Sequence, residues 1–227
     1  MKPRRIGLLG GTFNPIHNGH LHIASEVSKH LFLDQVLFIP SGLPPHKILL
    51  RIPSAGIRFK MVELALVAHP NFEPCDIEIK RSGFSYTLET LRALKEVHSH
   101  DRLFFIIGMD AFSQIETWKK PEAVLKLCDF AVISRPGFPF SMLPRLGPLA
   151  LADQNTLKQL DAGAIGTHTV WLTPKTELHL IHIPHSGISA SDIRRRILAG
   201  KSAKNLLPHS VESYIINSRL YKGDDNF

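Results

Sequence analysis

The stretch GGTFNPIHNGH, residues 10–20, joins a short apolar run at residues 5–9 to a segment of helical period at residues 18–33. The apolar run predicts a buried strand, and the Gly-Gly pair that ends it lets the backbone turn and come close to a ligand. The free N–H groups and the positive dipole end of the following helix suit a phosphate group. The stretch therefore predicts a strand–turn–helix unit that binds phosphate.

The rest of the chain alternates apolar runs with segments of helical period. Further strands are expected at residues 35–39, 75–79, 103–107, 130–133 and 178–183. Helices are expected at residues 58–68, 87–97, 152–160, 191–199 and 210–220, with a short one that Pro121 opens. Continuous apolar strands separated by helices predict a Rossmann-like, doubly wound α/β fold, in which a mostly parallel sheet has helices on both faces. The length fits a single domain over residues 1–227.

Four segments follow predicted strands or lie between a strand and a helix. They are residues 10–20, 40–47, 108–118 and 134–137. Parallel sheets bind ligands beyond the carboxyl ends of their strands, so we expect these segments to border one crevice. Prolines and glycines interrupt the alternation at residues 138–168.

Composition indicates a globular protein. The chain of 227 residues is 44% hydrophobic and 21% charged, which argues against disorder. No apolar run approaches the roughly 18 residues that a membrane helix needs, and the N-terminal apolar stretch is too short for a signal peptide. We therefore expect a cytoplasmic protein with no membrane partner. Cys75 and Cys128 form no CxxC pair, which favours two buried thiols.

The formal net charge of +7 fits either nucleic acid or a small polyanion such as ATP as partner. Basic residues are scattered, apart from short runs at residues 119–120 and 194–196. A nucleic-acid binder would show clustered basic and aromatic residues, so no nucleic-acid partner is expected.

His17 and His20 stand three residues apart at the start of the first predicted helix, where both can face one ligand. Imidazoles placed there could donate hydrogen bonds to phosphate oxygens and stabilise charge that develops during phosphoryl transfer. Surface histidines or zinc ligands are the alternatives, and the whole stretch favours phosphate. Other phosphate motifs do not fit, because Gly200-Lys201-Ser202 lacks the earlier glycine of a P-loop and no GxGxxG follows the first strand.

A second informative stretch is ISASDIR, residues 188–194. Ser191 is a plausible N-cap and Asp192 suits a first helical turn, which alone would describe an ordinary helix start. Beside the first stretch, we favour a second phosphate site in which Ser189, Ser191 and Arg194 surround ATP phosphates.

Together, GGTFNPIHNGH and ISASDIR resemble the signatures of the HxGH nucleotidyltransferase superfamily and, within it, the bacterial nicotinate-nucleotide adenylyltransferase family. Further segments fit that family: residues 44–47, Arg58 with Met61, residues 85–91, 107–118 and 134–137, and residues 207–208 through 214–215. Asn14 stands where the family often has Asp, and Ala190-Ser191 replaces the usual Ser-Thr. Residues 138–180 form an elaborated segment, longer than is usual for the family.

The resemblance implies an enzyme that transfers AMP from ATP to nicotinate mononucleotide, giving nicotinate adenine dinucleotide and pyrophosphate in NAD biosynthesis. It implies an ATP site of Gly10, Gly11, Thr12, Phe13, His17, His20, Ser189, Ser191 and Arg194. Of these, His17, His20 and Arg194 would be catalytic. The acceptor would contact Lys47, Thr87, Asp110, Trp118 and Arg135, with Trp118 stacking on the pyridine ring. For Lys47 the choice between oxygens of the acceptor and oxygens of the triphosphate stays open. Mg²⁺ would bind mainly through the ATP phosphates, and no residue is predicted to bind a metal directly.

Other functions stay open at this point. Within the superfamily, AMP could go to phosphopantetheine or CMP to a polyol phosphate, although Trp118 and residues 85–91 favour a pyridine nucleotide. Aminoacyl-tRNA synthetases share an HxGH-like signature, but this chain is short for one and has no KMSKS-like string. Residue types decide neither the nicotinate versus nicotinamide preference nor the oligomeric state.

Overall fold

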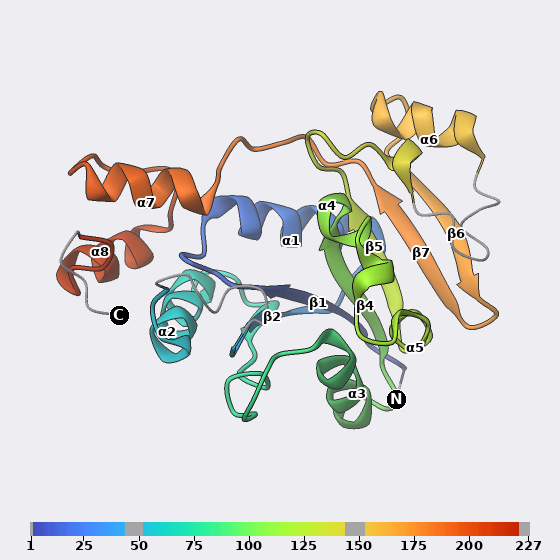
Figure 1. Cartoon of the computed structure of the whole chain (residues 1–227), viewed down its shortest axis with the longest axis horizontal. Helices are drawn as coiled ribbons and strands as arrows, with labels where there is room; N and C mark the ends of the chain where they lie inside the picture. The colour runs from blue at the N-terminus through green and yellow to red at the C-terminus, as the bar shows by residue number, and fades with distance from the viewer. Residues whose placement is uncertain (1, 44–51, 144–152, 223–227) are drawn as a thin grey trace. The chain divides into compact units, whose positions relative to one another are not determined.

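A single mostly parallel sheet organises the fold (Figure 1). The computed structural model describes residues 2–43, 52–143 and 153–222. Seven strands lie in the order β3-β2-β1-β4-β5-β7-β6. Their bounds are β1 Arg5–Gly11, β2 Gln35–Pro40, β3 Phe72–Pro74, β4 Arg102–Gly108, β5 Asp129–Ile133, β6 Thr167–Thr173 and β7 Thr176–Ile181. The pairs β1–β4, β4–β5 and β5–β7 are parallel, and β6 pairs antiparallel with β7. This sheet, with the helices between its strands, confirms the predicted Rossmann-like α/β class.

The helices follow the predicted alternation. They are α1 Asn18–Leu31, α2 Ala55–Leu66, α3 Thr87–Val97, α4 Met109–Phe112, α5 Pro121–Leu125, α6 Gln154–Asp161, α7 Ala190–Leu198 and α8 His209–Asn217, with 3-10 turns η1 Ile115–Thr117 and η2 Phe140–Met142. Helix α3 has the predicted bounds, and Pro121 opens α5 as expected. The helix expected at residues 152–160 begins at Gln154, capped by the Asp153 carboxylate, while Ala152 lies outside the described residues. No helix within the described ranges is both long and apolar enough to cross a bilayer.

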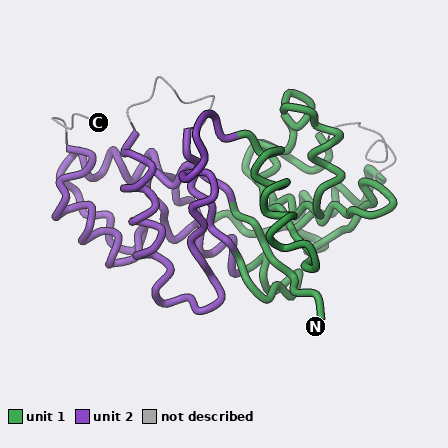
Figure 2. Tube along the Cα trace, turned by 90° about the horizontal axis from the view of Figure 1, so that it is seen from below, with its two compact units in different colours: residues 1–9, 26–36, 86–185 green, residues 10–25, 37–85, 186–227 purple. Residues whose placement is uncertain are grey.

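The chain divides into two compact units (Figure 2). Unit 1 holds residues 1–9, 26–36 and 86–185, and unit 2 holds residues 10–25, 37–85 and 186–227. Fully buried aromatic rings fill each unit: Phe104 and Phe130 in unit 1, and Phe38 in unit 2. The single domain over residues 1–227 stays a prediction. The elaborated segment, residues 138–180, contains η2, α6, β6 and most of β7.

Two strands differ from the sequence prediction. The strand expected at residues 75–79 lies instead at Phe72–Pro74. Residues 76–80 form a turn, since the N–H groups of Ile79 and Lys80 donate to the carbonyl of Asp76. Strand β6 was not predicted. As the edge strand of the sheet it has mostly exposed or half-buried side chains, and its sequence THTVWLT lacks the continuous apolar run of a central strand.

Charged side chains form an ion-pair network at the amino ends of β4, β5 and β7. The Arg102 guanidinium donates from Nε to Asp129 and from Nη2 to Glu177, the latter at 2.6 Å. The N–H of Glu177 donates to the other oxygen of Asp129, at 2.7 Å. Among the described residues, Asp129, Glu177 and His179 form the one group of three possible metal ligands, but Arg102 already engages both carboxylates. We interpret the network as structural.

Candidate active site

The loop after β1 holds Phe13 in an unusual conformation. Phe13 has a φ of +48°, which strains any residue other than glycine, and its ring is buried. The ring meets His20 edge to face, with centroids 5.0 Å apart, and lies 6.0 Å from the ring of Phe38. A Cβ at Gly11 would come within 3.2 Å of the Phe13 ring. Gly11 therefore leaves room for the ring that supports His20.

The two predicted histidines lie together at the start of α1. Their rings stack with centroids 3.7 Å apart, and the backbone N–H of His17 donates to Nδ1 of His20 at 3.2 Å. Because Nδ1 accepts this bond, a neutral His20 carries its proton on Nε2 and offers that nitrogen as a donor. A Cβ at Gly19 would lie 3.0 Å from Nδ1 of His17, so glycine keeps the stacked pair in place.

The start of α7 differs in one respect from the sequence prediction. Ser189, not Ser191, is the N-cap: its hydroxyl accepts from the N–H of Asp192 at 3.1 Å, and its backbone is extended. The helix starts at Ala190, so Ser191 already lies inside the first turn. The Ser189 hydroxyl also donates to Asp192 at 2.8 Å, and this bond, followed by the nearby charge of Arg195, lowers the pKa of Asp192.

Arg194 connects the two predicted phosphate segments. Its Nη1 donates to the backbone carbonyl of Asn14 at 2.7 Å, and its Nη2 donates to the hydroxyl of Ser191 at 3.2 Å. Asn14 itself is buried, and its side-chain oxygen accepts from the Tyr221 hydroxyl at 2.7 Å. The structure thus brings the GGTFNPIHNGH loop and the ISASDIR helix start together, all within unit 2.

Sequence reasoning missed what Arg58 does. This side chain is 1% exposed and binds four backbone carbonyls around the same loop. The sequence offered two signals for Arg58, its place one turn before Met61 on the buried stripe of α2 and the fit of both residues to the family pattern, and neither revealed these contacts.

In unit 1, two predicted acceptor residues form an ion pair. Nε of Arg135 lies 3.5 Å from the Asp110 carboxylate. Asp110 lies two residues after the end of β4, and Arg135 lies two residues after the end of β5. A Cβ at Gly108 would overlap the Asp110 carboxylate and lie 2.5 Å from Nε of Arg135. Only glycine at position 108 leaves room for this pair.

The other predicted acceptor residues of unit 1 are Thr87 and Trp118. Their neighbours in the chain, Glu89 and Lys119, form an ion pair that the sequence did not reveal. Thr87 is the first residue of α3, between Tyr86 and Glu89. Lys119, next to Trp118, pairs with Glu89 at 2.8 Å and lies over the Tyr86 ring at 4.4 Å. Trp118 is half-buried, with its ring edge to face against Phe105. Lys47 lies outside the described residues.

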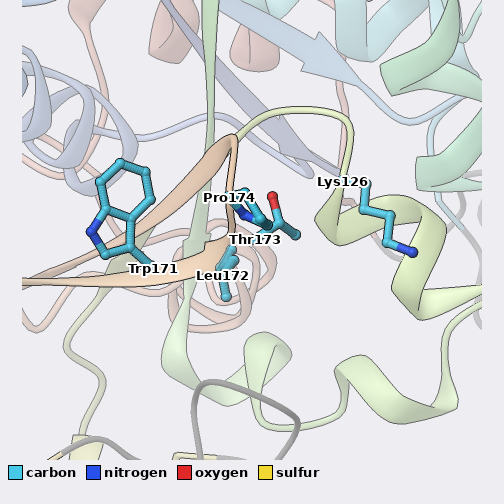
Figure 3. Close-up of a pocket in the computed structure, with 5 residues that line it drawn as sticks. All are labelled: Lys126, Trp171, Leu172, Thr173 and Pro174. Carbon is cyan, nitrogen blue, oxygen red and sulfur yellow. The ribbon is translucent and has the colours of Figure 1, made fainter.

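Of two pockets in the described residues, one is lined by a predicted acceptor residue and the other is not. A pocket of about 330 Å³ lies at the carboxyl ends of β5 and β7 and is lined by Arg135, residues 136–139, Asp161 and His182. A larger hollow of about 560 Å³ lies at the β6–β7 hairpin, where Figure 3 shows Lys126 and Trp171 on opposite sides of residues 172–174. No predicted site residue lines the larger hollow, so we base the acceptor site on Arg135 and its neighbours.

The side chains of the predicted ATP site are poor ligands for Mg²⁺, so they fit an ion that is bound by the ATP phosphates and water. They offer imidazoles, hydroxyls, backbone N–H groups and a guanidinium, none of which is the carboxylate that Mg²⁺ prefers. The carboxylate of Asp192, next to Ser191, accepts from the Ser189 hydroxyl and pairs with Arg195.

Known proteins resemble this chain in sequence and in fold. A cytidylyltransferase-like family model matches residues 8–196. The probable nicotinate-nucleotide adenylyltransferase of Desulfitobacterium hafniense (strain Y51) is 42% identical over 221 residues, which cover 97% of each chain. That of Geotalea daltonii is also 42% identical, over 96% of this chain and 98% of its own. Plasmodium falciparum nicotinic acid mononucleotide adenylyltransferase complexed with NaAD aligns with a TM-score of 0.70 and 20% identity, over 96% of this chain and 97% of its own. At that identity, the likeness to the solved structure shows the fold alone.

Proposed function

The chain belongs to the nicotinate-nucleotide adenylyltransferase family, and from this premise we propose that it transfers AMP from ATP to nicotinate mononucleotide, as an enzyme of NAD biosynthesis. The observation that carries the proposal is the 42% identity over 97% of the chain to a relative of that name. The grouping of His17, His20 and Arg194 at two helix starts supports it, because such a cluster suits a triphosphate.

The reaction is an in-line displacement at the α-phosphorus of ATP. An oxygen of the acceptor phosphate forms the new bond, the bond to the bridging oxygen breaks, and its electron pair leaves with pyrophosphate. A phosphate monoester has a second pKa of about 6, so the attacking oxygen is already ionised at neutral pH. The enzyme therefore needs no general base, and catalysis consists of positioning and electrostatic stabilisation.

The ATP part of the proposal rests on donor groups in unit 2. Nε2–H of His20 would donate to a phosphate oxygen, since its Nδ1 is engaged by the loop. His17 would act beside it, and Ser189, Ser191 and Arg194 would contact the triphosphate from the start of α7. Gly10, Gly11, Thr12 and Phe13 would line the site with backbone groups.

The acceptor part rests on unit 1. Trp118 would stack on the pyridine ring, and Thr87, Asp110 and Arg135 would border the nucleotide. Arg135 supports this role because it lines the 330 Å³ pocket and is oriented by Asp110. Lys47, which belongs to unit 2, would hold oxygens of the acceptor or of the triphosphate.

The proposed reaction uses ATP in complex with Mg²⁺. When bound, it would neutralise phosphate charge and lower the barrier to displacement. The residues named for the ATP site would hold it only through the phosphates and water, as their donor types suggest.

Pyrophosphate release tests the function. Purified protein is mixed with ATP, Mg²⁺ and one of three acceptors: nicotinate mononucleotide, nicotinamide mononucleotide or phosphopantetheine. Release with nicotinate mononucleotide, well above the other two, is expected. Release with phosphopantetheine alone would keep the nucleotidyl transfer but overturn the assignment of Trp118 and its neighbours. No release with any acceptor would overturn the proposed function.

A further inference from the structure

Arg58 is a cation in the interior of unit 2. It lies in the first turns of α2 and is 1% exposed, which makes it one of the largest fully buried side chains in the described residues. Burial lowers the pKa of Arg58, but an arginine side chain stays protonated in proteins. Its full positive charge is therefore held away from water.

Every hydrogen bond that the structure gives this guanidinium ends on a backbone carbonyl. Nε donates to Pro53 at 3.0 Å and Nη1 donates to Thr12 at 2.8 Å. Nη2 donates to Ser41 at 2.6 Å and to Gly42 at 3.1 Å. The four carbonyls belong to the segment before α2, the loop after β1 and the loop after β2.

Burying the charge of Arg58 lowers the stability of the folded protein. Within the described residues, the Arg58 guanidinium makes no ion pair with a carboxylate. The charge of Glu78 acts on the guanidinium only from a greater distance, where it opposes the effect of burial on the pKa. A buried charge that no carboxylate contacts is unfavourable, and an apolar side chain of similar volume often stabilises a protein more. An apolar side chain could not, however, bind the carbonyls of three separate segments. An arginine at this position therefore indicates that its role is to hold those three segments together.

The contacts also set the direction of the peptide groups. In a trans peptide the C=O and the following N–H point in opposite directions. At Ser41 the carbonyl accepts from Arg58, while the N–H of Gly42 donates on the other side to the Ser85 hydroxyl at 3.1 Å. By the same geometry, the bond to the Thr12 carbonyl turns the N–H of Phe13 away from Arg58.

We propose that Arg58 is a positioning residue for ATP: by binding the carbonyl of Thr12 together with those of Ser41 and Gly42, it ties the loop after β1 to the loop after β2, so that the N–H groups of the first loop and His20 meet the triphosphate. The proposal rests on the proposed function only in taking ATP as the ligand of this loop. Arg58 itself touches no substrate. Its effect passes through Thr12 to Phe13, whose ring meets His20 at 5.0 Å.

The test compares R58M and R58K with M61A. Met61 is fully buried on the same helix, one turn on, so M61A creates a core defect without touching the loop carbonyls. Calorimetry measures binding of α,β-methylene-ATP, which cannot react at the altered bridge and needs no acceptor. Thermal unfolding measures the melting temperature of each variant, and binding is measured well below all of them.

R58M should weaken binding of the analogue by about tenfold or more, which corresponds to about 1.4 kcal/mol. R58K should lie between R58M and the wild type, because one ammonium can serve only part of the carbonyl set. M61A should bind the analogue within about twofold of the wild type, even where its melting temperature falls as far as that of R58M. In turnover assays, KM for ATP should rise more than KM for the acceptor in R58K.

Wild-type binding by folded R58M would overturn the proposal, and so would equal losses of binding in M61A and R58M at equal losses of melting temperature. If R58M does not fold, R58K carries the test, and wild-type binding by R58K then overturns it. A wild-type protein that binds no ATP analogue would also overturn it. A wild-type protein that binds the analogue but releases no pyrophosphate with nicotinate mononucleotide would overturn the proposed acceptor and leave the role of Arg58 intact.

Discussion

The backbone N–H of His17 donates to Nδ1 of His20 across 3.2 Å, so the loop itself decides which nitrogen of His20 carries the proton. In the proposed reaction, the Nε2–H of His20 donates to a phosphate oxygen of ATP.

Replacing this donor should slow the chemical step. His20→Ala should lower kcat by about 10²–10³, the range for the loss of one preorganised donor to a developing oxyanion. Stopped-flow release of pyrophosphate measures it. His22 is exposed on the same helix, so His22→Ala is the matched control and should turn over normally. Near-normal turnover of a folded His20→Ala protein would contradict the role given to His20.

A methyl group at position 108 should disturb the Asp110–Arg135 pair. Gly108→Ala places a Cβ 2.5 Å from Nε of Arg135 and in overlap with Asp110, so one of the two side chains must move. We expect a higher KM for the acceptor, and a loss of stability of about 1–3 kcal/mol from overpacking.

The control for this substitution is Gly56→Ala. Gly56 lies in α2, and a Cβ there meets nothing within 4 Å. Alanine should therefore stabilise the helix by about 0.5–1 kcal/mol and leave the KM of both substrates unchanged. An unchanged acceptor KM in Gly108→Ala would show that Arg135 does not help to bind the acceptor.

The C-terminal Tyr221 should contribute to the order of the ATP loop. Its hydroxyl donates to buried Asn14 at 2.7 Å, and Tyr221→Phe leaves that oxygen without the bond. We expect a loss of about 1 kcal/mol, or roughly 2–4 °C in melting temperature for a chain of this size. Tyr214→Phe on α8 serves as control, since the Tyr214 hydroxyl bonds no other described residue. Equal melting temperatures in both variants would count against the contact.

Stability should fall on mild acidification because of His179. Burial is the main cause that lowers the pKa of His179 in the folded protein, against the opposing charges of Asp129 and Glu177. The unfolded chain keeps a histidine pKa of about 6.5, so below that pH the unfolded state binds a proton that the folded state excludes. The free energy of unfolding therefore decreases as the pH falls through about 6.5, by at most about 1.4 kcal/mol per pH unit.

Urea unfolding between pH 7.5 and pH 5.5 measures this slope. His179→Gln should reduce the slope, because it removes the group whose proton uptake differs between the two states. His22→Gln makes the same change of residue type at an exposed position and serves as the control. The same slope in His179→Gln and the wild type would refute this origin.

The sequence predicted those parts of the fold where one local pattern is strong. Apolar runs such as residues 103–107 and the helical period of residues 87–97 gave the central strands and α3. Strand β6 escaped because an edge strand is half exposed and carries no continuous apolar run. The cap of α7 was misplaced by two residues, since both Ser189 and Ser191 could cap and only the backbone geometry decides between them.

The site residues were found as motifs, and their roles stay predictions. What the sequence could not reveal are contacts between distant segments. Arg58 lies 46 residues from Thr12, and Lys119 lies 30 residues from Glu89. Neither pairing leaves a local pattern, because each depends on how the sheet brings separate loops to one place.

The network of Arg102, Asp129 and Glu177 sits at the amino ends of strands whose carboxyl ends lead to Asp110 and Arg135. Seven residues of β4, at about 3.3 Å each, separate the two ends by roughly 20 Å. If Asp110 and Arg135 bind the acceptor as proposed, we expect substitutions in the network to change the melting temperature of the protein with little effect on turnover. Relatives adapted to warmer or colder habitats could therefore differ in these three residues while the residues at the opposite ends of the strands stay the same.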